Sequence, residues 1–199
     1  MSNDLDRDDV FIDLATEIIS GYYWYLHFGT PCARWSALSH LNGGSRTLAN
    51  PDGIRPLTQP EAKSFLQVDR MCVLCALLAR RKGFFTIENP ACSLMFASSP
   101  VQALTGLVQT WTVVLDQCSY GLRPPSAEPW EFTKKSTKLL ANFPAIMDME
   151  RRCPGVSHTH RHTHAIGSRR ITESGRTRSV SLAMSASRYP AELCASLAL

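Results

Sequence analysis

Two short motifs in this chain of 199 residues place reactive side chains directly after apolar runs. Pro31 and Cys32 follow an aromatic run, and Glu88 and Asn89 follow a second apolar run. Such runs are typical of strands, and ligands of open α/β sheets bind beyond the carboxyl ends of the strands. We therefore predict one site in which the Cys32 thiol acts as a nucleophile and the Glu88 carboxyl protonates or orients a ring.

Each motif has a plainer interpretation when it is taken alone. A cysteine is often a small buried apolar residue, and an isolated Glu88 would be a surface carboxylate. The pair favours chemistry, because parallel neighbouring strands would bring both motifs to one edge of a sheet. A nucleophilic thiolate also needs a positive neighbourhood, and Arg34 is close to Cys32 in sequence.

Apolar periodicity predicts an α/β fold with about four strands. A strand, a long crossover, a helix and a second strand make a βαβ unit, so the first two strands should be parallel. The charge is uneven, since seven arginines lie between 151 and 179 and six acids lie before residue 18. The predicted strands are 22–28, 84–88, 111–116 and 136–142, and the predicted helices are 8–20, 59–82, 99–110 and 144–152.

The pattern divides the chain into three parts. We expect one α/β domain over 1–152, a Cys/His/Arg-rich loop or disordered segment over 153–181, and a C-terminal helix over 182–199, interrupted at Tyr189 and Pro190, that packs on the domain. Seven cysteines without a secretory signal indicate a reduced, intracellular protein, nuclear or cytoplasmic. No apolar run could cross a bilayer, so no membrane partner is expected. The oligomeric state stays open.

At these residues the chain resembles the catalytic half of the cytosine-5 DNA methyltransferases. The order strand, Gly-x-Pro-Cys-x-x-x-Ser, helix, strand, Glu-Asn-Pro is similar in both. The resemblance implies that Cys32 attacks C6 of a flipped-out cytosine in DNA and that Glu88 contacts N3, with Pro31 and Asn89 as their partners. It also implies S-adenosylmethionine as the methyl donor and a Rossmann-like, doubly wound sheet.

Further motifs resemble methyltransferase-like segments of retroelement polyproteins and of eukaryotic reading frames. A strand with a glycine-rich turn for the cofactor is not evident before the Pro-Cys strand. The resemblance therefore implies a truncated or degenerate domain of mobile-element origin, without its N-terminal cofactor-binding strands and inactive as an isolated chain. The shared motifs read here as 116–121, 135–140, 153–160 and 189–194.

The segment after residue 152 also carries metal-ligand residue types. Cys153 is followed by alternate histidines from His158 onward, and Cys together with His suits zinc. We predict a zinc site of Cys153, His158 and His160 with Cys118 as a fourth ligand; the alternative is a solvated loop that collects metal adventitiously. The spacing of Cys72 and Cys75 within an apolar helix instead predicts buried core residues.

A second hypothesis is a non-catalytic nucleic-acid-binding or interaction module that a Cys/His zinc clip holds together. DNA is the candidate partner in both hypotheses. The arginine-bearing loop between 33 and 59 offers Arg34 and Arg46 as phosphate contacts, and a solvated loop would carry the same residues.

Overall fold

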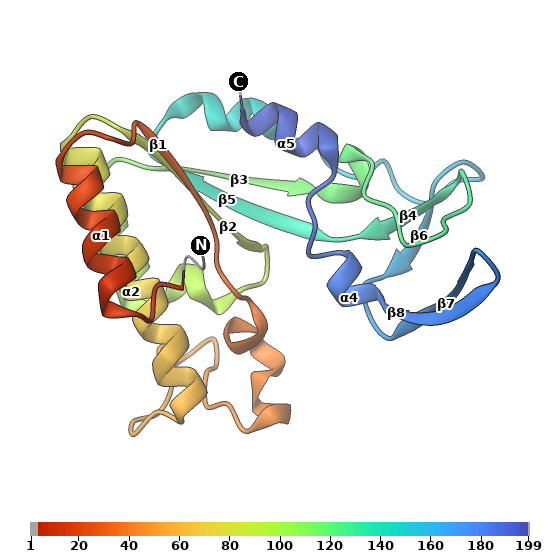
Figure 1. The fold of residues 1–199 in the computed structure, drawn as a ribbon, viewed down its shortest axis with the longest axis horizontal. Helices are drawn as coiled ribbons and strands as arrows, with labels where there is room; N and C mark the ends of the chain where they lie inside the picture. Colours follow the sequence, from red (N-terminus) through yellow and green to blue (C-terminus); the bar gives the residue numbers. More distant parts are fainter. Residues whose placement is uncertain (1–3, 199) are drawn as a thin grey trace. The chain divides into compact units, whose positions relative to one another are not determined.

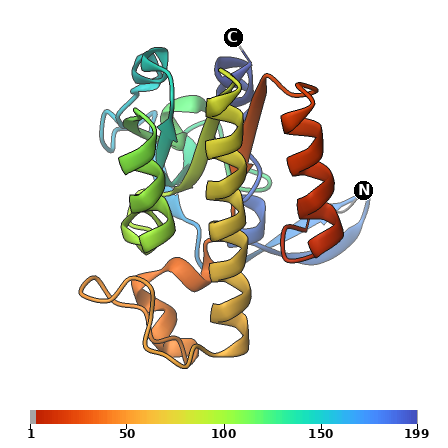
Figure 2. The ribbon, with the colours of Figure 1, turned by 90° about the vertical axis from the view of Figure 1, so that its left-hand side faces the viewer.

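A layer of three helices covers one face of a four-stranded sheet in the first part of the chain. The computed structural model describes residues 4–198, which separate into two units. Unit 1 comprises residues up to 113 together with 138–147, and unit 2 comprises 114–137 together with the residues from 148 onward. Helices α1 (Asp8–Ile19), α2 (Gln59–Arg80) and α3 (Ser99–Leu107) stand side by side in Figure 2.

The sheet contains the four strands that the sequence predicts, and the fold is mixed α/β. Its strand order is β1-β2-β5-β3, with β1 and β2 parallel. Strand β5 returns in the opposite direction between β2 and β3, so the sheet is mixed (Figure 1). The bounds are β1 (Tyr25–Gly29), β2 (Phe84–Pro90), β3 (Trp111–Asp116) and β5 (Ser136–Ala141).

Helix α2 is the crossover between β1 and β2. It begins with a capping box, in which Thr58 and Glu61 satisfy each other's backbone N–H groups. Its apolar face packs on the sheet, where Phe85 and Ile87 of β2 are fully buried. Cys72 and Cys75 also lie in this core, as their apolar surroundings in the sequence predict.

Unit 2 contains strands where the sequence predicts loop or disorder. The segment 153–181 forms β6 (Arg161–His164), β7 (Ser168–Glu173) and β8 (Arg176–Ser181). Strand β6 pairs in parallel with β4 (Glu131–Lys134), and β7 pairs antiparallel with β8. Ser174 and Gly175 between β7 and β8 both have positive φ, which suits a two-residue hairpin turn. Because 153–181 is mostly polar, the spacing of apolar residues did not predict this hairpin.

The remaining elements are short. The predicted helix at 144–152 is a 3₁₀ helix, and the predicted C-terminal helix is broken in two, with its second part contacting the 3₁₀ turn after β3. None of the described helices is long and apolar enough to span a bilayer. These elements are η1 (Ala33–Trp35), η2 (Ala37–Asn42), η3 (Leu94–Ala97), η4 (Gln117–Tyr120), η5 (Pro144–Met149), α4 (Leu182–Ser185) and α5 (Ala191–Leu197).

Two glycines of unit 1 provide a matched test of this packing. A Cβ at Gly83 would lie 2.5 Å from Cδ1 of the fully buried Leu78 and 3.1 Å from the Trp24 carbonyl oxygen. A Cβ at Gly106 of α3 would meet no atom within 4 Å. We expect Gly83→Ala to lower the free energy of unfolding by about 1–3 kcal/mol. Gly106→Ala should raise it by about 0.5 kcal/mol.

Urea unfolding of the two variants measures both changes. A neutral Gly83→Ala would contradict the close packing of α2 against the start of β2.

Candidate functional site

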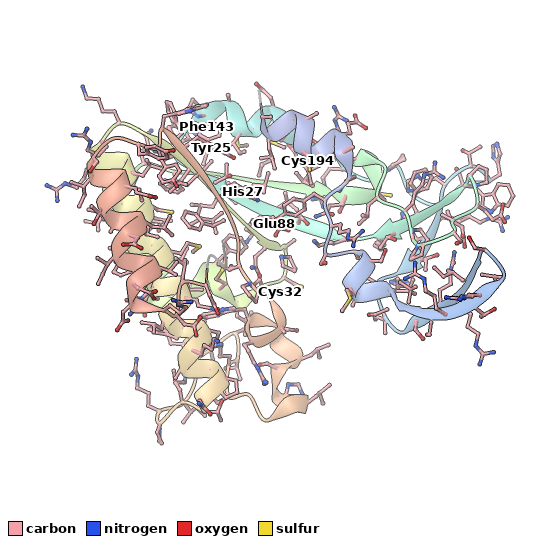
Figure 3. All side chains as sticks on the ribbon, viewed as in Figure 1. Tyr25, His27, Cys32, Glu88, Phe143 and Cys194 are labelled. Atoms are coloured by element: carbon pink, nitrogen blue, oxygen red, sulfur yellow. The ribbon has the colours of Figure 1, made fainter. Side chains whose placement is uncertain are left out.

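The register of the parallel pair brings the two sequence motifs to one edge of the sheet. Gly29, the last residue of β1, is paired with Glu88 of β2. Cys32 follows Gly29 by three residues, at the start of η1. Figure 3 shows Cys32 and Glu88 at the same end of the two strands. The predicted parallel pairing is confirmed, and both chemical groups lie beyond or at the carboxyl end of their strands.

The Asn89 amide ties the two motifs together directly. Its Nδ2 donates hydrogen bonds to the Thr30 carbonyl oxygen at 2.9 Å and to the Thr30 hydroxyl oxygen at 3.0 Å. Asn89 is fully buried, and Thr30 immediately precedes the Pro31–Cys32 pair. The side chain next to Glu88 therefore holds the turn that presents Cys32.

The thiol and the carboxyl differ in their access to solvent. Cys32 and Pro31 are exposed, whereas the Glu88 residue is only 6 % exposed. An exposed thiol can meet a substrate, and a buried carboxyl can donate a proton or a hydrogen bond in a medium with little water. This combination suits attack on a polarised ring.

Three polar residues beside Glu88 were not identified from the sequence. The Thr86 hydroxyl lies 2.7 Å from the Tyr25 hydroxyl and 2.7 Å from Nδ1 of His27. Burial lowers the pKa of His27, and the charge of Glu88 opposes that shift. Residues two apart in a strand share a face, so Thr86 and Glu88 point to the same side of β2. Only the strand register reveals this row of polar side chains, because Tyr25 and His27 lie about sixty positions before Thr86 in the sequence.

The structure corrects the prediction that Arg46 contacts nucleic acid. The Arg46 guanidinium is fully buried, with its central carbon 3.7 Å from the centre of the Trp35 ring. It donates hydrogen bonds to the Arg34 carbonyl, the Ser64 hydroxyl and the Glu61 carbonyl. Arg46 therefore anchors the segment between η2 and α2 to η1 and to the start of α2. Arg34 is half-buried in η1 beside Cys32, and a role in DNA contact stays a prediction for it.

A separate cluster of metal-ligand side chains lies within unit 2. It consists of Cys118, Cys153, His160 and His162, whose ligand atoms all lie within 4.8 Å of one another. Cys153 Sγ is 3.5 Å from Nε2 of His160 and 3.2 Å from Nε2 of His162. The two Nε2 atoms are 3.0 Å apart. We call these four residues the Cys/His cluster.

Three segments of unit 2 supply the Cys/His cluster. Cys118 lies in η4, Cys153 follows η5, and His162 lies in β6 directly after His160 and Arg161. The Cys153 N–H donates to the Asp116 carboxylate at 2.9 Å, and the His160 ring stacks on Phe132 with 4.3 Å between ring centres. Backbone and ring contacts therefore hold the ligand atoms in place.

His158 is not part of the Cys/His cluster, which corrects the predicted ligand set. His158 is exposed, in the turn closed by hydrogen bonds between Ser157 and His160. Strand β6 begins at Arg161, and its alternation points His160 and His162 to the same side. Several pairs of alternate histidines in this run could have supplied the two nitrogen ligands. The position at which β6 begins determines that the pair is His160 and His162.

The protonation of the Cys/His cluster reflects its burial. Burial, together with the neighbouring Cys153 thiol, raises the pKa of Cys118 to about 11. Burial and the charge of His160 lower the pKa of His162.

Comparison with models of protein families, with curated proteins and with solved structures gave no match to this chain.

The cysteines of unit 1 should react in an order set by exposure. Cys32 and Cys92 are exposed, whereas burial and the charge of Asp69 raise the pKa of Cys72 to about 12. Cys75 is fully buried, and burial raises its pKa as well. Because the thiolate is the reactive species, we expect iodoacetamide at pH 8 to modify Cys32 and Cys92 and to spare Cys72 and Cys75 until the protein is unfolded.

Peptide mapping by mass spectrometry after timed quenching measures this order. Equal rates at Cys32 and Cys75 in native protein would contradict the exposure of the Pro31–Cys32 turn.

Proposed function

We propose that Cys32 and Glu88 form the pyrimidine-attacking site of a cytosine-5 DNA methyltransferase-like domain. The observation that carries the proposal is the parallel register of β1 and β2, together with the hydrogen bonds from Asn89 to Thr30. These interactions bring an exposed thiol and a buried carboxyl to one sheet edge, the arrangement that addition to a cytosine ring requires.

The chemistry begins with addition of the Cys32 thiolate to C6 of the base. A bond forms between Sγ and C6, the C5–C6 double bond opens, and Glu88 delivers a proton or a hydrogen bond to N3. The ring then carries negative character at C5, where a proton from water can bind. Loss of the original C5 proton to water, return of the N3 proton or hydrogen bond to Glu88 and expulsion of the thiolate restore the cytosine, so hydrogen at C5 exchanges with solvent.

The described residues do not offer a recognisable site for S-adenosylmethionine. Within residues 4–198, each strand of the four-stranded sheet leads into a 3₁₀ turn, and none passes through a glycine-rich turn into an α-helix. That turn is what brings a nucleotide-type cofactor close to the backbone. Cys32 and Glu88 therefore support attack on the base, and we assign no methyl-transfer step to this site.

Exchange at C5 tests the proposal without a methyl donor. With a DNA oligonucleotide tritiated at C5 of cytosine, we expect the wild-type chain to release tritium to water above the background rate. Cys32→Ser should reduce release to background, because the adduct with C6 cannot form. Glu88→Gln should slow release at least tenfold, because general acid catalysis typically contributes 10²–10⁴-fold.

Cys92→Ser is the matched control, since it removes another exposed thiol of unit 1. Release that is equal in wild type and Cys32→Ser would reject the proposal. The same chain should show no transfer from S-adenosylmethionine and no calorimetric binding of it. Saturable binding would mean that residues described as loop or 3₁₀ turn form the donor site.

A second candidate function is a nucleic-acid-binding module held together by a Cys/His zinc clip. The observation that favours it is the charge of unit 2, whose residues include eleven Lys or Arg and seven Asp or Glu, a balance of +4. The net charge of the whole chain is also +4. Basic surface of this kind attracts nucleic-acid phosphates.

The β7–β8 hairpin is the part of unit 2 best suited to contact DNA. Arg170 and Arg176 are exposed on opposite faces of it, with Arg176 next to the turn. Ser and Thr side chains share a face with Arg170, because register pairs Arg170 with Ser179 and Thr172 with Thr177. The base of the hairpin is fixed, since Arg169 donates to both carboxylate oxygens of Glu131 at 2.8 and 2.9 Å. A two-stranded ribbon fits the major groove of B-form DNA.

Removal of hairpin charge tests this second candidate. Each phosphate contact that is lost should reduce the slope of log affinity against log salt by about one. We therefore expect the double variant Arg170→Gln, Arg176→Gln to reduce the slope by about two in fluorescence anisotropy with duplex DNA. The double variant Arg80→Gln, Arg188→Gln removes the same charge from exposed positions outside the hairpin. Equal slopes for both double variants would exclude the hairpin as the contact surface.

A further inference from the structure

We propose that the Cys/His cluster is a closed, four-coordinate zinc site that stabilises unit 2. Three of the ligand-atom separations, those among Cys153, His160 and His162, agree with a tetrahedron around one ion. From zinc–nitrogen bonds of about 2.0–2.1 Å and zinc–sulfur bonds of about 2.3 Å, two nitrogens should be about 3.3 Å apart and a nitrogen and a sulfur about 3.5 Å apart. The corresponding separations here are 3.0 Å, and 3.2 and 3.5 Å.

Zinc satisfies all four ligand atoms better than protons do. Nε2 of His160 and Nε2 of His162 face each other at 3.0 Å, where a single hydrogen bond is the most that protons can provide. A cation uses both nitrogen lone pairs at once. Two thiolates and two neutral imidazoles also balance the charge of Zn²⁺.

The donor set identifies the metal and its role. Two sulfurs and two nitrogens in a tetrahedral arrangement suit zinc better than magnesium or calcium, which prefer oxygen ligands. Four protein ligands leave no position for water or substrate, so the site is structural and does not activate a nucleophile. Cys118 and Cys153 could alternatively form a disulfide, which leaves both histidines without a role.

The ligands also belong to segments that unit 2 must hold together. The main apolar cluster of buried residues lies entirely in unit 1, and the buried apolar residues of unit 2 are scattered among short elements. The Cys/His cluster joins η4, the segment after η5 and β6. Strand β6 pairs with β4, and Glu131 of β4 binds Arg169 of the β7–β8 hairpin. Metal binding at one point therefore stabilises most of the strands of unit 2.

Metal content of the full chain gives the direct test. Protein is purified under reducing conditions and dialysed without metal, and its metal content is measured by elemental mass spectrometry. We expect about one zinc per chain. Cys153→Ser and His162→Asn should lose that zinc. His158→Ala and Cys194→Ser are the matched controls, because both residues are exposed and lie outside the cluster. Both controls should retain the full equivalent.

Three further readouts need no variant to fold. Cobalt bound to the wild-type chain should give the intense visible absorption of a tetrahedral site and the near-ultraviolet bands of thiolate ligands. A chelator should lower the melting temperature by roughly 10 °C or more. Lowering the pH should release the metal as the ligands take up protons.

Three outcomes would overturn the zinc site. They are metal-free protein with an unchanged melting temperature, loss of zinc in His158→Ala with retention in His162→Asn, and a chain 2 Da lighter that carries a Cys118–Cys153 disulfide. Tritium release depends on Cys32 in unit 1, so failure of the zinc site and failure of the proposed methyltransferase-like site are measured separately.

Discussion

The parallel pairing of β1 and β2 is the interaction on which the rest of unit 1 depends. Parallel strands cannot be joined by a tight turn, so the chain must leave the sheet and return through a crossover. Helix α2 is that crossover, and its apolar face buries Phe85 and Ile87. A slip of one residue would send these side chains to the opposite face and would move Glu88 toward the helices. Burial of the helix-facing side thus fixes the register of Glu88 against Gly29.

Buried polar interactions extend this order into the turn and loop beyond β1. Asn89 bonds to Thr30, and Arg46 bonds to backbone and hydroxyl oxygens while it stacks on Trp35. A buried guanidinium is costly unless its N–H groups find acceptors. Three of these acceptors come from η1 and from the first turns of α2. The long loop between β1 and α2 is consequently anchored from within, although its sequence is rich in glycine, serine and asparagine.

Much of unit 1 could be predicted from the sequence because apolar spacing is its main determinant. The periodicity of α2 and the short apolar strands identified the four-stranded sheet and the shared edge of Cys32 and Glu88. The burial of Arg46 could not be predicted, since an arginine in a polar loop is normally exposed and its acceptors are distant in sequence. The β6, β7 and β8 strands were missed because Ile171 and Val180 are the only apolar residues in them, too few to give an alternating pattern. His162 rather than His158 belongs to the Cys/His cluster because of where β6 begins. The four alternate histidines in the sequence do not show where that strand begins.

The order β1-β2-β5-β3 also leaves β1 at one margin of the sheet. Within the described part of the chain, β1 has a strand neighbour on one side, so backbone amide and carbonyl groups along its other side remain directed outward. A strand edge of this kind can accept another strand by β-augmentation, in which main-chain hydrogen bonds provide the attraction. The Pro31–Cys32 turn follows β1 directly. A strand added at this edge would therefore lie beside the Cys32 thiol. A second polypeptide could supply that strand without any change in the β1–β2 register.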